Sequence, residues 1–171
     1  MSAVLDVRAA PVLSDEDRAR AEHYAVLSRL FASAPDAEFL HKLPALAAAW
    51  GSSGNALGQA WLMLRDAALS TDAEQLEDEY TRLFLTIGRP DVMLFGSFYM
   101  AGFLMEGPVV ELRADLAELG LGRRFGVTES EDHIAALCDV MRHPIVTRPD
   151  AAGLGRQQLF SPRHVAPWSS A

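Results

Sequence analysis

Residues 128–141 read Thr-Glu-Ser-Glu-Asp-His-Ile-Ala-Ala-Leu-Cys-Asp-Val-Met, an acidic segment followed by an apolar pattern with helical spacing. The apolar side chains at intervals of three and four residues are Ile134, Leu137, Cys138 and Met141. This interval places them on one face of an α-helix. Thr128 and Glu131 have the spacing of a capping box, so we expect the helix to begin within the acidic segment.

The same spacing recurs towards the N-terminus. A first helix is expected between Ser14 and Pro35, and a second from Asp36 to Leu43, where Pro44 kinks or restarts it. The further expected segments are a loop at 51–55, helices at 57–68, 71–87 and 108–119, and a turn at 88–91. No stretch alternates apolar and polar residues as a half-buried strand does. We therefore predict an all-α protein, a single-domain helical bundle.

The composition limits the class of protein. Of the 171 residues half are hydrophobic, and the formal net charge is −8. This apolar content excludes a disordered chain, and the acidic balance argues against a nucleic-acid partner. The one cysteine, Cys138, excludes an internal disulfide framework. The longest uncharged run, residues 92–105, is shorter than the ~20 residues of a membrane span. The first residues lack a signal-peptide pattern, so we expect a cytoplasmic protein that is not integral to a membrane.

The prolines gather near the C-terminal end of the chain. Four of the nine follow His143. We expect a disordered N-terminal arm at residues 1–13, followed by one all-helical domain at 14–171. Within that domain we expect a hinge at about 143–153 and a C-terminal part, 154–171, in which only residues 154–160 are helical.

Sequence signals of catalysis and cofactor binding are scarce. The chain has no Gly-x-Gly-x-x-Gly, no phosphate-binding Gly-Lys-Ser/Thr and no Gly-x-Ser-x-Gly. Glu38 and His41 have the Glu-x-x-His spacing of di-iron bundles, but those sites need a second such motif, and this chain has none. Cys138 lies on a predicted inner face and is expected to be a structural thiol. We predict no catalytic residue, no metal and no cofactor.

Three local motifs carry a functional resemblance. They are Tyr80-Thr-Arg-Leu-Phe84, Phe95-Gly-Ser-Phe-Tyr99 and Glu129-Ser-Glu-Asp-His133. In this order and spacing, over about residues 14–168, they resemble the TorD/DmsD/NarJ family of cytoplasmic chaperones for molybdenum-cofactor oxidoreductases. The family's Glu-Pro-x-Asp-His motif has Ser130 in place of its proline here.

The resemblance implies an all-helical, non-catalytic chaperone. Its partner would be the apo form of a molybdopterin-dependent oxidoreductase, of the formate dehydrogenase, nitrate reductase or sulfoxide reductase type. The chaperone would bind the partner's twin-arginine signal peptide, its body, or both, assist cofactor insertion and delay export. The residues that the resemblance assigns to signal-peptide binding are Glu129, Asp132, His133, Phe95, Ser97, Tyr99, Tyr80 and Phe84.

The residue types suit this role. A twin-arginine signal is a basic segment followed by an apolar one, and carboxylates such as Glu129 and Asp132 pair well with guanidinium groups. His133 adds a pH-sensitive neighbour. The methionines and aromatic residues of the run 92–105 suit a conformable apolar wall. An alternative is a helical adaptor module with an unrelated partner.

Structural roles explain the same residues. Asp132 and Glu131 can satisfy the first amides of a helix, and the aromatic run can belong to the core. The acidic stripe Glu111, Asp115 and Glu118 is expected to be a solvated helix face.

The resemblance implies last C-terminal helices beyond the final residue of this sequence, so either the chain is naturally shortened or the natural product continues. We therefore expect an under-covered apolar face around Met141, Phe160 and Trp168. Such a face favours self-association, with a homodimer formed by exchange about the hinge as one outcome.

Overall fold

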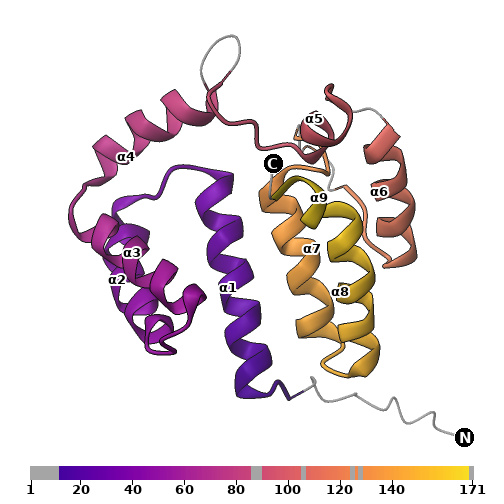
Figure 1. Ribbon diagram of the computed structural model, residues 1–171, viewed down its shortest axis with the longest axis horizontal. Coiled ribbons are helices and arrows are strands. Elements are labelled where there is room, and N and C mark those ends of the chain that lie inside the picture. The colour runs from indigo at the N-terminus through magenta and orange to yellow at the C-terminus, as the bar shows by residue number, and fades with distance from the viewer. Residues whose placement is uncertain (1–11, 86–89, 105–106, 124–125, 127–128, 170–171) are drawn as a thin grey trace, which may run out of the picture. The chain divides into compact units, whose positions relative to one another are not determined.

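The computed structural model describes residues 12–85, 90–104, 107–123, 126 and 129–169, and these fold almost entirely into helices (Figure 1). The helices are α1 (Asp15–Ala32), α2 (Ala37–Gly51), α3 (Ala56–Leu69), α4 (Ala73–Tyr80), the π-helical turn η1 (Thr81–Leu85), α5 (Gly96–Ala101), α6 (Gly107–Glu118), α7 (Ile134–Thr147), α8 (Ala151–His164) and α9 (Ala166–Ser169). Within the described ranges, strand-like pairing is limited to one isolated bridge, between Phe95 and His133. The predicted all-α class is confirmed.

The chain divides into two compact units. The larger unit comprises residues 1–28 and 95–171, and the smaller unit residues 29–94. In the larger unit, α7 packs along α8, and α5 packs against α6 and α9. In the smaller unit, α2 and α3 form a closely packed pair. None of the described helices combines the length and the hydropathy needed to cross a membrane.

The core of the larger unit includes two residues of the helix face that the sequence predicts, Leu137 and Met141. Its buried side chains are Leu112, Leu116, Leu137, Met141 and Phe160, with Tyr24 and Val165 among those packed around them. Burial of each large apolar side chain contributes ~1.5–3 kcal/mol. The expected under-covered face is therefore wrong for Met141 and Phe160, because both are buried in this core. The side chain of Trp168 lies outside the described residues.

Cys138 is also buried in the larger unit. Burial, with a smaller contribution from the charge of Asp139, raises the pKa of its thiol to about 12. The thiolate is the reactive form of cysteine, and it is not populated at neutral pH when the pKa lies this high. The environment of Cys138 is thus that of an inert structural residue.

Two helix starts differ from the prediction. The helix expected from residue 71 begins as α4 after its N-cap Asp72, whose carboxylate accepts from the amide of Gln75. The helix α7 begins at Ile134 with His133 as its N-cap, so the acidic segment precedes the helix instead of opening it. Thr128 lies outside the described residues, as does the expected turn at 88–89. Aspartate competes well with threonine for a cap position, which explains the shift at α4.

The C-terminal part is more helical than its prolines predict. Pro144 lies inside α7 and Pro162 inside α8, which runs well beyond the expected residues 154–160. Pro44 likewise lies inside α2 without ending it. A proline inside a helix costs about 3 kcal/mol. In α7 the neighbouring Ile145 and Pro144 itself are buried, and this packing offsets the lost hydrogen bond.

The acidic stripe on α6 is solvated only in part. Glu111 and Glu118 are exposed as expected, but Asp115 is half-buried. The Oδ2 atom of Asp115 lies 2.6 Å from Nε2 of His164 and 2.7 Å from Nη1 of Arg163. Burial raises the pKa of Asp115, but the hydrogen bond from His164 and the charge of Arg163 outweigh it and hold that pKa below its ordinary value. Asp115 therefore ties α6 to α8.

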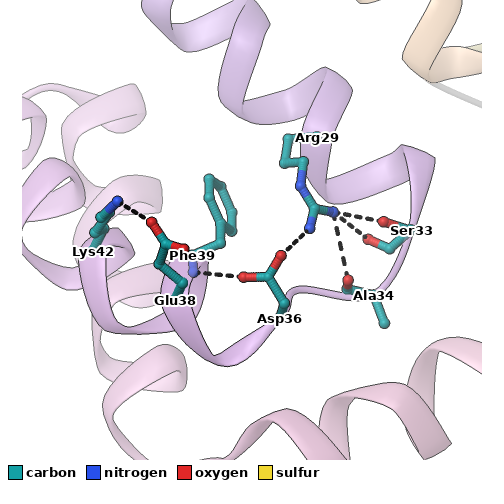
Figure 2. Close-up of polar contacts among 7 residues, drawn as sticks. All are labelled: Arg29, Ser33, Ala34, Asp36, Glu38, Phe39 and Lys42. Atoms are coloured by element: carbon teal, nitrogen blue, oxygen red, sulfur yellow. Dashed lines mark hydrogen bonds and ion pairs between the residues drawn. The ribbon is translucent and has the colours of Figure 1, made fainter.

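A polar network turns the chain from α1 into α2 in the smaller unit (Figure 2). Arg29 donates to Oγ of Ser33 at 2.6 Å and to Oδ2 of Asp36 at 2.7 Å. Asp36 in turn caps α2 by accepting from the amide of Phe39 at 2.8 Å. Beyond the turn, Glu38 pairs with Lys42 at 2.6 Å, one helical turn away. The carboxylate of the lone Glu-x-x-His motif thus has an ordinary surface partner.

Candidate functional site

The acidic segment 129–133 and the start of α5 come together in the larger unit. The amide of Gly96 donates to the backbone oxygen of Asp132 at 3.1 Å, and the amide of Ser97 donates to its Oδ2 atom at 2.8 Å. The rings of Phe95 and His133 meet edge to face, with centroids 5.1 Å apart. Two of the three motifs, with 29 residues between them in the chain, therefore form one structure.

Asp132 serves as the missing cap of α5. The N-cap position of this helix is Phe95, whose side chain makes no capping hydrogen bond. The carboxylate of Asp132 takes that role from a distant part of the chain and meets the amide of Ser97, which is itself buried. A hydrogen bond to a charged group contributes ~1.5–3 kcal/mol. Asp132 thus satisfies a helix amide, as expected. The amide belongs to α5, however, and not to the helix that follows Asp132 in the sequence.

Two oxygen atoms of the acidic segment are buried without a partner among the described residues. They are Oδ1 of Asp132 and Oγ of Ser130, and both residues are 4% exposed. A buried polar atom without a hydrogen bond costs ~1–3 kcal/mol, and more where the group is charged. The segment therefore holds unused capacity to accept hydrogen bonds.

His133 has a fixed ring orientation. Its Nδ1 atom accepts from the amide of Ala135 at 3.2 Å, which assigns the proton of the neutral ring to Nε2. Burial lowers the pKa of His133, while the charges of Glu129 and Asp132 oppose that shift without cancelling it. The imidazole is thus held neutral as a helix cap.

Glu131 has a partner that the sequence did not indicate. Arg113 on α6 reaches it with two hydrogen bonds, from Nε to Oε1 at 3.0 Å and from Nη2 to Oε2 at 2.9 Å. This bidentate contact lowers the pKa of Glu131, against the opposing effect of its partial burial. No local spacing links residues 18 apart on different elements, so the sequence carries no signal for this pair.

Apolar side chains are exposed at the other end of α5. Tyr99 and Met100 are exposed on the helix, and Phe103, 71% exposed, follows it with Leu104. Of the predicted apolar residues here, Phe95 is half-buried and Met105 lies outside the described residues. A six-residue helix is about 9 Å long. The acidic segment at the start of α5 and the exposed apolar residues at its end are therefore close neighbours.

Tyr80 and Phe84 belong to the smaller unit and are engaged there in packing. The hydroxyl of Tyr80 donates to the backbone oxygen of Phe31 at 2.8 Å. The ring of Phe84 lies edge to face with those of Tyr80, at 4.9 Å, and Phe31, at 6.4 Å. Burial raises the pKa of Tyr80, opposed by the charge of Arg29. Both predicted residues thus join the end of α1 to α4 and η1.

A separate hollow of about 290 Å³ lies in the larger unit between α1, the end of α7 and the start of α8. Its charged lining residues are Asp17, Arg20, Arg148 and Asp150. Arg20 already donates to Asp17 at 3.0 Å and to the side chain of Gln157. None of the predicted site residues lines this hollow. Among the described residues, no three His, Cys, Asp or Glu side chains are grouped so that they could hold a metal ion.

Comparison with known proteins gives two matches. The profile of a family described as "Nitrate reductase delta subunit" matches residues 52–171. Among solved structures, the fold is similar to that of a protein from Archaeoglobus fulgidus described as a redox enzyme maturation protein, with a TM-score of 0.55 and 20% identity over 84% of this chain and 91% of that one. No curated protein matches the chain.

Proposed function

The chain belongs to the nitrate reductase delta subunit family, a family of redox enzyme maturation chaperones, and from this premise we propose that it binds the twin-arginine signal peptide of an apo molybdenum oxidoreductase. Binding would hold the partner in the cytoplasm until its cofactor is inserted and so delay export. The chaperone itself would carry out no chemical step.

One observation supports this proposal most strongly: α5 joins an acidic segment to an exposed apolar surface. Glu129 is exposed in the acidic segment, and Phe103 is exposed just beyond the other end of the helix. An extended peptide advances ~3.3 Å per residue. About three residues would therefore separate arginines at the acidic segment from the first apolar side chains at α5, which suits a basic segment followed by an apolar one.

The acidic charge of the chain also supports binding of a cationic peptide. The formal net charge of the chain is −8, and three of the residues 129–132 are acidic. Opposite charge raises the association rate of a cationic peptide and makes it sensitive to salt. Arginine, with its planar fork of donors, suits carboxylates better than lysine does.

We predict that a synthetic peptide with two adjacent arginines and an apolar continuation binds more tightly than the same peptide with two lysines. Isothermal titration would give both affinities, at low salt and again at ~0.5 M salt, where screening weakens exposed charge pairs. Equal affinities for the two peptides would favour the adaptor-module alternative over the chaperone proposal.

Two variants would locate the binding surface. Phe103→Ser removes an exposed apolar anchor and is expected to weaken binding by roughly tenfold, the effect of losing ~1.4 kcal/mol. Leu159→Ser is the matched control, because Leu159 is similarly exposed on α8. Equal weakening in both variants, or in neither, would place the peptide elsewhere.

A further inference from the structure

We propose that Arg113 is an internal substitute for a ligand arginine: it occupies the carboxylate of Glu131 in the unliganded protein, and an arginine of the bound peptide displaces it. This inference rests on the proposed function and adds to it a residue that regulates access to the site. Glu131 then becomes a ligand-binding residue, whereas its position in the sequence predicts only a capping role.

The geometry of the Arg113–Glu131 ion pair supports its replacement by a pair between Glu131 and a peptide arginine. Arg113 presents its Nε and Nη2 atoms side by side to the two oxygens of Glu131, at 3.0 and 2.9 Å. Any arginine that binds a carboxylate side-on, through Nε and one Nη, uses the same two parallel bonds. A peptide arginine can therefore reproduce the contact that Arg113 makes.

Exchange of Arg113 for a peptide arginine requires that Arg113 is the more exposed partner of the pair, and this is the case. The side chain of Glu131 is 11% exposed, whereas that of Arg113 is 49% exposed. Arg113 is the partner that can return to water, because about half of its side chain is already solvated. Glu131 would be left as a poorly solvated carboxylate that needs a new cation.

The residues beside Glu131 give an incoming peptide more to bind. Oδ1 of Asp132 and Oγ of Ser130 are buried and have no partner among the described residues. They belong to the two residues that flank Glu131, so a second peptide arginine or the peptide backbone would reach them only as the segment opens on departure of Arg113. A ligand with paired cations thus matches the segment better than Arg113 alone does.

The competition predicts that removing Arg113 tightens binding. We expect Arg113→Met, which keeps an apolar stem of similar length, to bind the two-arginine peptide roughly two- to fivefold more tightly, because the peptide no longer has to displace a competing arginine. The matched control is Arg142→Met, since Arg142 is an exposed arginine on α7 of the same unit. In an Arg113→Met, Glu131→Gln double variant the gain should vanish.

A direct signal of displacement comes from the Nε–H resonance of Arg113 in ¹⁵N-labelled protein. Adding peptide should shift this resonance and speed its exchange with water, while a purely structural Arg113 would keep it unchanged. Thermal unfolding of each variant would show that it is folded. A folded Arg113→Met protein with unchanged or weaker affinity would overturn the inference while leaving the proposed function intact. Absence of binding to both the parent protein and Arg113→Met would contradict the proposed function and the inference together.

Discussion

Asp132 illustrates how a single side chain serves both the fold and the candidate site. One carboxylate oxygen caps α5, and the other is buried without a partner among the described residues. Removal of this carboxylate would leave the amide of Ser97 without its acceptor and so loosen α5. If an Asp132 variant loses binding, its stability must therefore be measured as well.

Asp132→Ala is expected to lower the free energy of unfolding by ~1.5–3 kcal/mol, the contribution of a hydrogen bond to a charged group. Urea unfolding followed by circular dichroism would measure it. Glu129→Ala, at an exposed acid of the same segment, should change the stability by no more than ~0.5 kcal/mol. Equal losses in both variants would contradict the capping role of Asp132.

His133 predicts a pH dependence whose sign follows from its lowered pKa. The unfolded chain binds a proton near the ordinary histidine pKa, while the folded protein resists protonation to lower pH because burial disfavours the charged ring. Stability is therefore complete above the unfolded pKa and is lost as pH falls through and below it. His23, whose pKa is also lowered by burial, contributes in the same direction.

Replacing His133 with serine, another good N-cap residue, should remove part of this dependence. The measurement is the urea midpoint between about pH 7.5 and pH 5.5, a range in which histidine titrates and most carboxylates do not. The parent protein should lose more stability across the range than His133→Ser. Identical slopes would contradict the assignment to His133.

At the scale of the element, the junction of α7 and α8 depends on Gly153. A Cβ atom at this position would lie 1.9 Å from the backbone oxygen of Arg148 and 2.9 Å from that of Pro144. The start of α8 thus approaches the end of α7 more closely than any side chain permits. The turn between the two helices, within the segment expected to act as a hinge, is held by this approach.

Gly153→Ala should destabilise the protein by at least ~1–3 kcal/mol, the usual cost of forcing extra volume into a packed site. Gly155→Ala is the matched control, because a Cβ there meets nothing within 4 Å. In the interior of α8 that control should be stabilising by ~0.5–1 kcal/mol. Thermal unfolding of the two variants measures both stability changes. A stabilised Gly153→Ala protein would contradict the close approach of α8 to the end of α7.

The helix faces were predictable from the sequence, whereas several helix ends were not. The face of α7 follows from regular spacing, because burial of Leu137 and Met141 dominates its energy. The start of α7 after His133 and the passage of α8 through Pro162 both differ from what the capping-box and proline signals predict. The cap of α5 by Asp132 was not predictable either, since its donor and acceptor are 35 residues apart.

At the scale of the whole molecule, the sequence motifs fall into two units. Phe95, Ser97, Tyr99, Glu129, Asp132 and His133 lie in the larger unit, and Tyr80 and Phe84 in the smaller one. The resemblance assigns Asp132 and the segment 95–99 to one binding role, and in the structure Asp132 meets residues 96 and 97. The resemblance did not anticipate Glu131 and Arg113, because an ion pair between exposed elements leaves no periodic trace. The homodimer stays a prediction. An exposed apolar face at Met141 and Phe160 does not support it, because both side chains are buried.

The acidic segment and the apolar end of α5 form one binding surface in this account. The most direct test is a ¹⁵N chemical-shift map of the protein titrated with the two-arginine peptide. We predict that the largest shifts fall on the amides of residues 96–104 and 129–135. Shifts confined to the hollow beside Arg148 and Asp150, or to the α2–α3 pair, would contradict the account.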